Sequence, residues 1–158
     1  MRARGSGAIV QLSSMGGQMS FAGFSAYSAT KFALEGFSEA LADELGQFGI
    51  KVLIVEPGAF RTGLFASNSE SVPSETYADS VGQTRAMIEA GDGAQPGDPA
   101  KAAAAILKAL DAEQTPLRLA LGGDAVDAIA AHLDTVRADL ATWEQIARDT
   151  TFDTVSNE

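Results

Sequence analysis

The sequence predicts an α/β fold: a doubly wound parallel sheet of about three strands with flanking helices. Two short apolar runs, residues 7–14 and 51–55, predict strands that are largely buried. Between them, over residues 25–46, apolar residues recur at spacings of three and four, which is the periodicity of a helix. A strand, a helix and a strand in this order form a βαβ unit, whose strands pair in parallel beneath covering helices.

The helix predicted over residues 25–46 carries two apolar strips, so we expect it to pack on two sides. Leu34 and Leu45 belong to the narrower strip. The wider strip contains Ala29, Phe32, Ala33, Gly36, Phe37, Ala40 and Leu41. Gly46 and Gly49 then supply the signals that end the helix.

Residues 63–97 differ in composition from the rest of the chain. They are rich in Ser, Gly and acidic residues, and their apolar residues form one amphipathic patch around Tyr77, Val81, Met87 and Ile88. A long insertion beside the ligand-binding edge of a sheet is typical of a mobile cover. We therefore expect this insertion to cover the substrate.

After the insertion, the pattern of helix and strand resumes. Asp98 is expected to cap a helix from its N-terminal end, with Pro99 in the first helical position and the helix running over residues 100–112. Residues 117–121 alternate in polarity and predict a third strand.

The end of the chain, over residues 124–149, predicts an amphipathic helix or a pair of helices. Trp143 and Phe152 are expected to anchor it to the rest of the fold. We predict one domain over residues 1–150 and a frayed tail over residues 151–158.

Composition excludes several classes of function. The formal charge of −10, from 11 basic and 21 acidic residues, argues against nucleic acid or an anionic membrane as a partner. The chain has no cysteine and a single histidine, His132, so disulfides, thiolate metal sites and multi-histidine zinc sites are excluded and we expect no metal. No apolar run is long enough to span a membrane, and we expect a cytoplasmic protein.

Three side chains could carry chemistry at one edge of the predicted sheet. Parallel strands place Ser14 and Pro57 together at their carboxyl ends, where open α/β sheets bind ligands. Tyr27 and Lys31 stand four residues apart and share one face of the helix. A cation one turn from a phenol favours the phenolate, which would let Tyr27 exchange protons near neutral pH. Taken alone, each of these features is common on protein surfaces and in turns.

As an ordered set, these residues resemble the short-chain dehydrogenase/reductase family. Ser14 closes an apolar strand, Tyr27-Ser28-Ala29-Thr30-Lys31 opens an Ala/Gly-rich helix, and Val55-Glu56-Pro57-Gly58-Ala59-Phe60-Arg61-Thr62 follows the second strand. The resemblance covers about residues 7–121. It implies a Rossmann-like fold and an enzyme that transfers a hydride between NAD or NADP and an alcohol or ketone.

The resemblance also assigns roles to matching residues. It implies that Tyr27 is the general acid/base, that Lys31 assists it and holds the nicotinamide ribose, and that Ser14 hydrogen-bonds the reacting oxygen of the substrate. Tyr27 and Lys31 would thus also contact the cofactor. The resemblance further implies that Pro57, Gly58, Phe60 and Thr62 line the nicotinamide.

The sequence departs from the family in what it lacks. The family's glycine-rich Thr-Gly-x-x-x-Gly-x-Gly turn, its Asn-Ala-Gly stretch and its further catalytic asparagine are not in this sequence. We therefore expect a truncated fold that corresponds to the C-terminal half of such an enzyme, without the pyrophosphate-binding segment and inactive as given. NAD and NADP stay alternatives, because the residues that read the ribose 2′ position precede this part of the fold.

Two other functions stay open at this point. The chain could act as a non-catalytic interaction module, including a homo-oligomer, that associates through exposed sheet and helix faces. A sugar-nucleotide epimerase of the extended branch of the same superfamily is a weaker alternative, because the short C-terminal region offers little room for a nucleotide-sugar domain.

Overall fold

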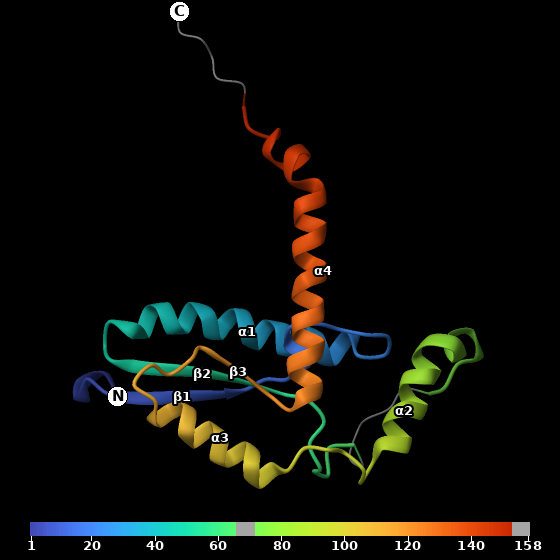
Figure 1. Cartoon of the computed structure of the whole chain (residues 1–158), viewed down its shortest axis with the longest axis horizontal. Coiled ribbons are helices and arrows are strands. Elements are labelled where there is room, and N and C mark those ends of the chain that lie inside the picture. Colours follow the sequence, from blue (N-terminus) through green and yellow to red (C-terminus); the bar gives the residue numbers. More distant parts are fainter. Residues whose placement is uncertain (66–71, 153–158) are drawn as a thin grey trace, which may run out of the picture.

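The computed structural model describes residues 1–65 and 72–152 of the chain. It contains three strands and four α-helices, with short 3-10 and π-helical segments between them (Figure 1). Their order along the chain is β1 (Gly7–Leu12), α1 (Ser25–Gly46), β2 (Ile50–Pro57), α2 (Gln83–Gly91), α3 (Pro99–Asp111), β3 (Arg118–Leu121) and α4 (Gly123–Arg148).

The three strands form one parallel sheet in the order β1-β2-β3. Gly7 pairs with Ile50 at one end of the β1–β2 ladder and Leu12 pairs with Val55 at the other. On the other side of β2, Val55 also pairs with Leu119 of β3. The predicted parallel α/β sheet of three strands is therefore confirmed, with β2 at its centre.

Helices cover both faces of the sheet, α1 on one and α3 on the other (Figure 1). On the α3 side, Leu53 and Val55 are fully buried and pack with Leu121. The partly buried residues around them are Phe60, Ala102, Ala105, Ile106, Ala109, Leu110 and Leu119. This apolar cluster is the core that holds α3 and β3 to the central strand.

The face of β2 that meets α1 is more polar. Val52 and Ile54 are buried there, but so are Glu56 of β2 and Glu35 and Ser38 of α1. The narrower apolar strip of α1 therefore faces the sheet. This face contains the buried carboxylate of Glu35 as well as leucine side chains.

Two predictions about packing are wrong. Most of the wider strip of α1 is not packed among the described residues, since Phe32 is 47% and Phe37 is 58% exposed and only Leu41 is half-buried. Strand β1 is half-buried instead of largely buried, because Val10 and Leu12 are exposed on one of its faces. In both places the described part of the chain supplies no second layer to cover the apolar side chains.

The segment between β2 and α3 holds more helix than the sequence suggested. A 3-10 helix over Glu75–Tyr77 and a π-helix over Ala78–Gly82 lead into α2. Residues 66–71 of the predicted cover lie outside the described part of the chain. At its end, a bridge between Phe60 and Gly97 returns the segment to the edge of the sheet.

Helix α3 begins as predicted. The Asp98 carboxylate accepts hydrogen bonds from the backbone N–H groups of Ala100 at 2.8 Å and Lys101 at 3.4 Å, and Pro99 is the first residue of the helix. Asp98 thus satisfies backbone donors that have no partner within the helix.

Helix α4 is one continuous helix of 26 residues, and it projects away from the sheet (Figure 1). Ala125 and Ile129 in its first turns are buried, but every described residue from Leu133 onward is exposed. The prediction that Trp143 and Phe152 anchor the helix is wrong, because they are 60% and 100% exposed. Of the predicted tail, residues 153–158 lie outside the described part.

None of the helices in the described ranges combines the length and the apolar character that crossing a bilayer requires.

Candidate active site

The carboxyl ends of β1 and β2 bring Ser14 beside Pro57, as the parallel topology predicts. The Ser14 hydroxyl donates to the Pro57 carbonyl at 3.5 Å and accepts a hydrogen bond from the Gly16 N–H at 3.1 Å. Ser14 is the N-cap of a short 3-10 helix, η2 (Met15–Gly17), which follows β1 directly. The backbone of η2 therefore fixes where the hydroxyl points.

Tyr27 and Lys31 lie one turn apart near the start of α1. The Lys31 ammonium donates to the Leu12 carbonyl at 2.9 Å, so it ties α1 to the end of β1. The same nitrogen lies 5.7 Å from the centre of the Tyr27 ring, within the range of a cation–π contact. On the other side, Phe24 packs edge-to-face on Tyr27, with ring centres 5.7 Å apart.

Gly16 is the point where these groups converge. A Cβ atom added to Gly16 would lie 3.1 Å from Cε1 of Tyr27 and 3.5 Å from the Ser14 hydroxyl oxygen. The tyrosine ring and the serine hydroxyl thus approach the same backbone atoms, and a side chain at Gly16 would require the Tyr27 ring to move by a few tenths of an ångström. The structure brings Ser14, Tyr27 and Lys31 together around one turn.

The segment after β2 is held in place by backbone contacts and one carboxylate. The Gly58 N–H donates to the Leu121 carbonyl at 2.9 Å, and the Ala59 N–H donates to the Asp124 carboxylate at 2.6 Å. Asp124 also occupies the space into which a Cβ of Gly58 would point. Sequence reasoning missed Asp124, although an acidic residue in the first turn of a helix signals a capping or positioning role.

Phe60 and Thr62 continue this segment along the same edge. Phe60 pairs with Gly97 and packs on the core below, whereas Thr62 is exposed. The Thr62 hydroxyl accepts a hydrogen bond from the Leu64 N–H at 3.3 Å. All four residues assigned to the nicotinamide lie on one strand end and the turn after it.

A buried polar network lies behind η2. The Arg118 guanidinium is within 3.1 Å of Glu35, 2.9 Å of Glu39 and 3.1 Å of Glu56. Gln18, immediately after η2, donates to Glu56 at 2.8 Å. The network therefore joins the serine-bearing turn to α1, β2 and β3.

The carboxyl group of Glu56 lies in the buried part of this network. Burial raises the pKa of Glu56 above its ordinary value, and the negative charge of Glu35 adds to the increase. The hydrogen bond from Gln18 and the positive charge of Arg118 act in the opposite direction. Sequence reasoning did not find the partners of Glu56, although a charged residue inside an apolar strand signals a buried pair.

The donors at this edge suit a sugar hydroxyl and a carbonyl oxygen. Lys31 has three N–H donors, and one of them is used by Leu12. Among the described residues, no hydrogen bond is made by the Tyr27 hydroxyl. A nicotinamide ribose therefore fits the residues present, and a phenol, a serine hydroxyl and an ammonium at one edge can bind and protonate an oxygen.

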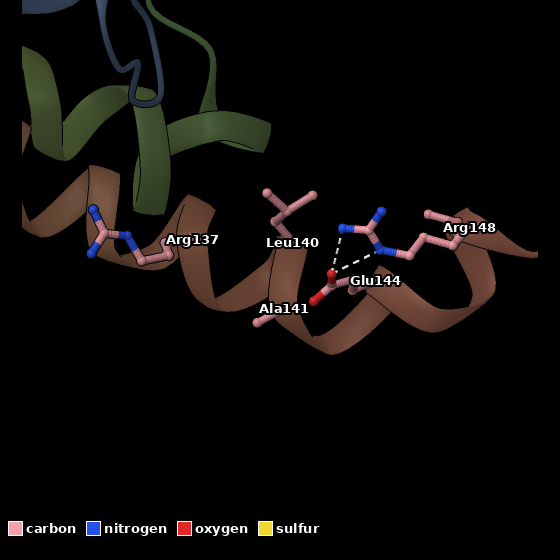
Figure 2. Close-up of a pocket in the computed structure, with 6 residues that line it drawn as sticks. Arg137, Leu140, Ala141, Glu144 and Arg148 are labelled. Atoms are coloured by element: carbon pink, nitrogen blue, oxygen red, sulfur yellow. Dashed lines mark hydrogen bonds and ion pairs between the residues drawn. The ribbon is translucent and has the colours of Figure 1, made fainter.

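Two surface hollows, of about 410 and 460 Å³, lie away from these residues. The first lies on α4 alone (Figure 2). The second is lined by Val72, Pro73, Ser74, Glu75, Tyr77, Ala78, Val81, Gly82 and Arg85. Neither includes Ser14, Tyr27 or Lys31, so the candidate site is an open edge of the sheet and not one of these hollows.

Comparisons with known proteins point to one family. The family model of short chain dehydrogenases matches residues 1–73. The oxidoreductase BOA17 of Botryotinia fuckeliana is 38% identical over 93% of this chain and 54% of its own length. The 3-ketodihydrosphingosine reductase of Bacteroides thetaiotaomicron is 40% identical over 77% of this chain and 46% of its own length.

Solved structures give the same result. A short-chain dehydrogenase from Streptomyces avermitilis is 63% identical and matches 96% of this chain and 55% of its own, with a TM-score of 0.88. A short-chain dehydrogenase/reductase from Burkholderia phymatum, solved in complex with NAD, shares the fold at 15% identity and a TM-score of 0.70 over 88% of this chain and 51% of its own. The chain spans about half the length of these relatives. With a partial Rossmann-like sheet and these relatives, the chain belongs to the short-chain dehydrogenase/reductase family.

Proposed function

We propose that this chain carries the proton-transfer machinery of an NAD- or NADP-dependent oxidoreductase that interconverts an alcohol and a ketone. The observation that carries the proposal is the convergence of Tyr27 and Ser14 on Gly16, with Lys31 held beside the tyrosine ring. A relative that is a ketone reductase by name supports a carbonyl substrate. A cytoplasmic location, with which the cysteine-free composition is compatible, is part of the proposal.

Each of the three side chains has one task. The Ser14 hydroxyl hydrogen-bonds the substrate oxygen and so orients it toward Tyr27. In reduction, the Tyr27 phenol gives its proton to that oxygen as the alcohol forms, and in oxidation the phenolate takes the proton back. The Lys31 ammonium favours the phenolate through its charge and offers its free N–H donors to the ribose hydroxyls.

The cofactor would rest on the neighbouring segment. When bound, the nicotinamide supplies or accepts the hydride, which no side chain can do. Pro57, Gly58, Phe60 and Thr62 would line it, and Asp124 would keep this segment in position through its bond to Ala59. Residues 63–97 would cover the substrate, and the single domain would run over residues 1–150.

The test uses a chimaera, because the family's glycine-rich turn is not in this sequence. The part of the Streptomyces avermitilis relative that this chain leaves uncovered is joined before Gly7, and NADH- and NADPH-dependent reduction of a panel of ketones is measured. Tyr27→Phe should lower kcat by about 10²- to 10⁴-fold, the usual contribution of a positioned acid or base.

The control is Thr142→Val, which removes a hydroxyl from the exposed part of α4, outside the candidate site and outside the segment proposed to cover the substrate. It should leave kcat unchanged. Turnover retained in the Tyr27→Phe chimaera would refute the assignment of the general acid/base.

A further inference from the structure

Helix α4 carries a heptad pattern along its length. Apolar residues recur in alternating steps of three and four at Val126, Ile129, Leu133, Val136, Leu140, Trp143 and Ala147, and Ile146 is the one large apolar residue of the helix outside this stripe. A stripe of this width, with a period of 3.5 residues, is the seam of a coiled coil, whereas a helix that packs on a sheet needs a broader apolar face. The stripe is therefore shaped for another helix.

Most of this seam has no partner in the described part of the chain. Ile129 is 8% exposed because the body of the protein covers it. Beyond that point Leu133, Val136, Leu140 and Trp143 are 50%, 48%, 68% and 60% exposed. The available seam thus begins where α4 leaves the body (Figure 1).

We propose that the projecting half of α4 pairs with the same half of a second copy of this chain, in an antiparallel two-helix coiled coil. In an antiparallel pair, a residue at the first core position of a heptad (position a) packs against a residue at the second core position (position d) of the partner helix. Leu140 then packs on Trp143 of the second copy, and Val136 packs on Ala147. Both layers occur twice, because the pair is symmetric.

Charge complementarity selects this register. The flanking positions beside the Leu140–Trp143 layers place Arg137 of each copy opposite Glu144 of the other, giving two ion pairs. A shift of one heptad in one direction would place Arg137 of one chain opposite Arg137 of the other. A shift in the opposite direction would place Glu144 of one chain opposite Glu144 of the other. Such a shift replaces attraction by repulsion between like charges.

The isolated helix leaves Arg137 available for this contact. Figure 2 shows that Glu144 pairs within the helix with Arg148, whose Nη2 lies 2.7 Å away, while the Arg137 guanidinium stands apart. Both members of the Glu144–Arg148 pair are exposed, so the carboxylate can accept from a second guanidinium without losing the first.

A parallel pair is disfavoured on two grounds. It would place Asp139 of one copy beside Glu144 of the other, which are like charges. It would also bring both bodies to the same end of the pair, because the body lies at the N-terminal end of each α4 (Figure 1). The antiparallel arrangement puts the two bodies at opposite ends.

Disulfide trapping tests both the pairing and its direction, since the chain has no cysteine of its own. Val136→Cys and Ala147→Cys chains are oxidised separately and as a mixture. The antiparallel pair predicts a mixed dimer in the mixture and little cross-linking of either variant alone. In that pair, identical positions lie about 16 Å apart along the helix axis, too far for a disulfide.

Sedimentation velocity over micromolar to millimolar chain concentrations tests the seam. Leu140→Gln should lower the association constant about tenfold or more, since two apolar layers are lost. Ala138→Gln places the same side chain on the outward face and should leave association unchanged. Arg137→Glu should weaken association roughly three- to tenfold, and adding Glu144→Lys should restore it.

The results that overturn the proposal are equally definite. If each cysteine variant alone cross-linked as strongly as the mixture, the two helices would be parallel. Equal association of the Leu140→Gln and Ala138→Gln chains would show that another surface joins the copies. A wild-type chain that stays monomeric throughout would refute the pairing of α4 with a second copy. Circular dichroism confirms that each variant keeps its helix.

Discussion

At the scale of single residues, Gly16 is the position where a small change should most disturb the candidate site. A methyl group at Gly16 would crowd the Tyr27 ring at 3.1 Å, so Gly16→Ala should lower the free energy of unfolding by about 1–3 kcal/mol and displace the ring. Thermal or urea unfolding, with nuclear Overhauser contacts to the Tyr27 ring, measures both effects.

The matched substitution Gly36→Ala should act in the opposite direction. Gly36 lies inside α1, and a Cβ there would meet no atom within 4 Å. Alanine is the better helix former, so this variant should gain about 1 kcal/mol of stability. If Gly16→Ala and Gly36→Ala changed the stability in the same direction, that result would contradict the packing described around Gly16.

Glu56 should make stability depend on pH. Because its pKa is raised in the folded state, folding binds a proton that the unfolded chain has already released. This contribution is fully present below the ordinary glutamate pKa of about 4.3 and is lost as pH rises through the raised value. The unfolding free energy of the wild type, relative to Glu56→Gln, should therefore fall across that window.

Urea unfolding at a series of pH values measures this difference. The exposed glutamate Glu113 provides the control, because Glu113→Gln should follow the wild-type curve in the same window. If the difference in unfolding free energy between the wild type and Glu56→Gln did not change with pH, the burial of Glu56 would not control its protonation.

At the scale of elements, the cap of α3 is a separable contribution. Asp98→Ala removes two hydrogen bonds to backbone N–H groups and should lower the free energy of unfolding by about 1 kcal/mol. Asp111→Ala changes the same residue type at the other end of α3, where a negative charge is unfavourable to the helix dipole. That variant should be neutral or slightly more stable in chemical unfolding. Equal losses in both variants would argue against a specific cap.

Elements with a strong local signal were predictable, whereas burial was predicted correctly for β2 but not for β1 or for the outer face of α1. The bounds of α1 agree with the predicted residues 25–46, and the cap of α3 follows from Asp98-Pro99 alone. The exposure of Phe32 and Leu12 depends on whether a further layer lies over them, which an apolar pattern cannot reveal. The same limit applies to Trp143, the predicted anchor of the last helix, which is 60% exposed.

The candidate site divides in the same way. A strand end and helical spacing single out Ser14, Tyr27 and Lys31, but their roles come from the family resemblance, because each local feature alone is common. The parallel topology places Ser14 beside Pro57. Arg118, Gln18 and Asp124 reach their partners across long stretches of chain, so no local pattern indicates these contacts.

At the scale of the whole molecule, cofactor binding by the 158-residue chain should be weak. Most of the binding energy for a dinucleotide in doubly wound folds comes from the glycine-rich first βα turn, and this sequence contains no such turn. Losing several charge-assisted hydrogen bonds, at about 1.5–3 kcal/mol each, lowers affinity by several powers of ten.

Fluorescence titration of the purified chain with NADH and NADPH measures this directly. We expect no saturation in the micromolar range and no hydride transfer to a ketone. The chimaera described above serves as the positive control for cofactor binding. Saturable micromolar binding by the chain itself would contradict the expectation that the pyrophosphate site lies elsewhere.

The edge position of β1 also has a consequence for solubility. Among the described residues β1 pairs only with β2, so the backbone N–H and C=O groups along its other side are available to another strand. Its sequence, Gly7–Leu12, contains neither charge nor proline, the features that normally stop edge-to-edge addition. Concentrated solutions of this chain should therefore aggregate by adding strands at β1, a route to precipitation that does not require unfolding and does not involve α4.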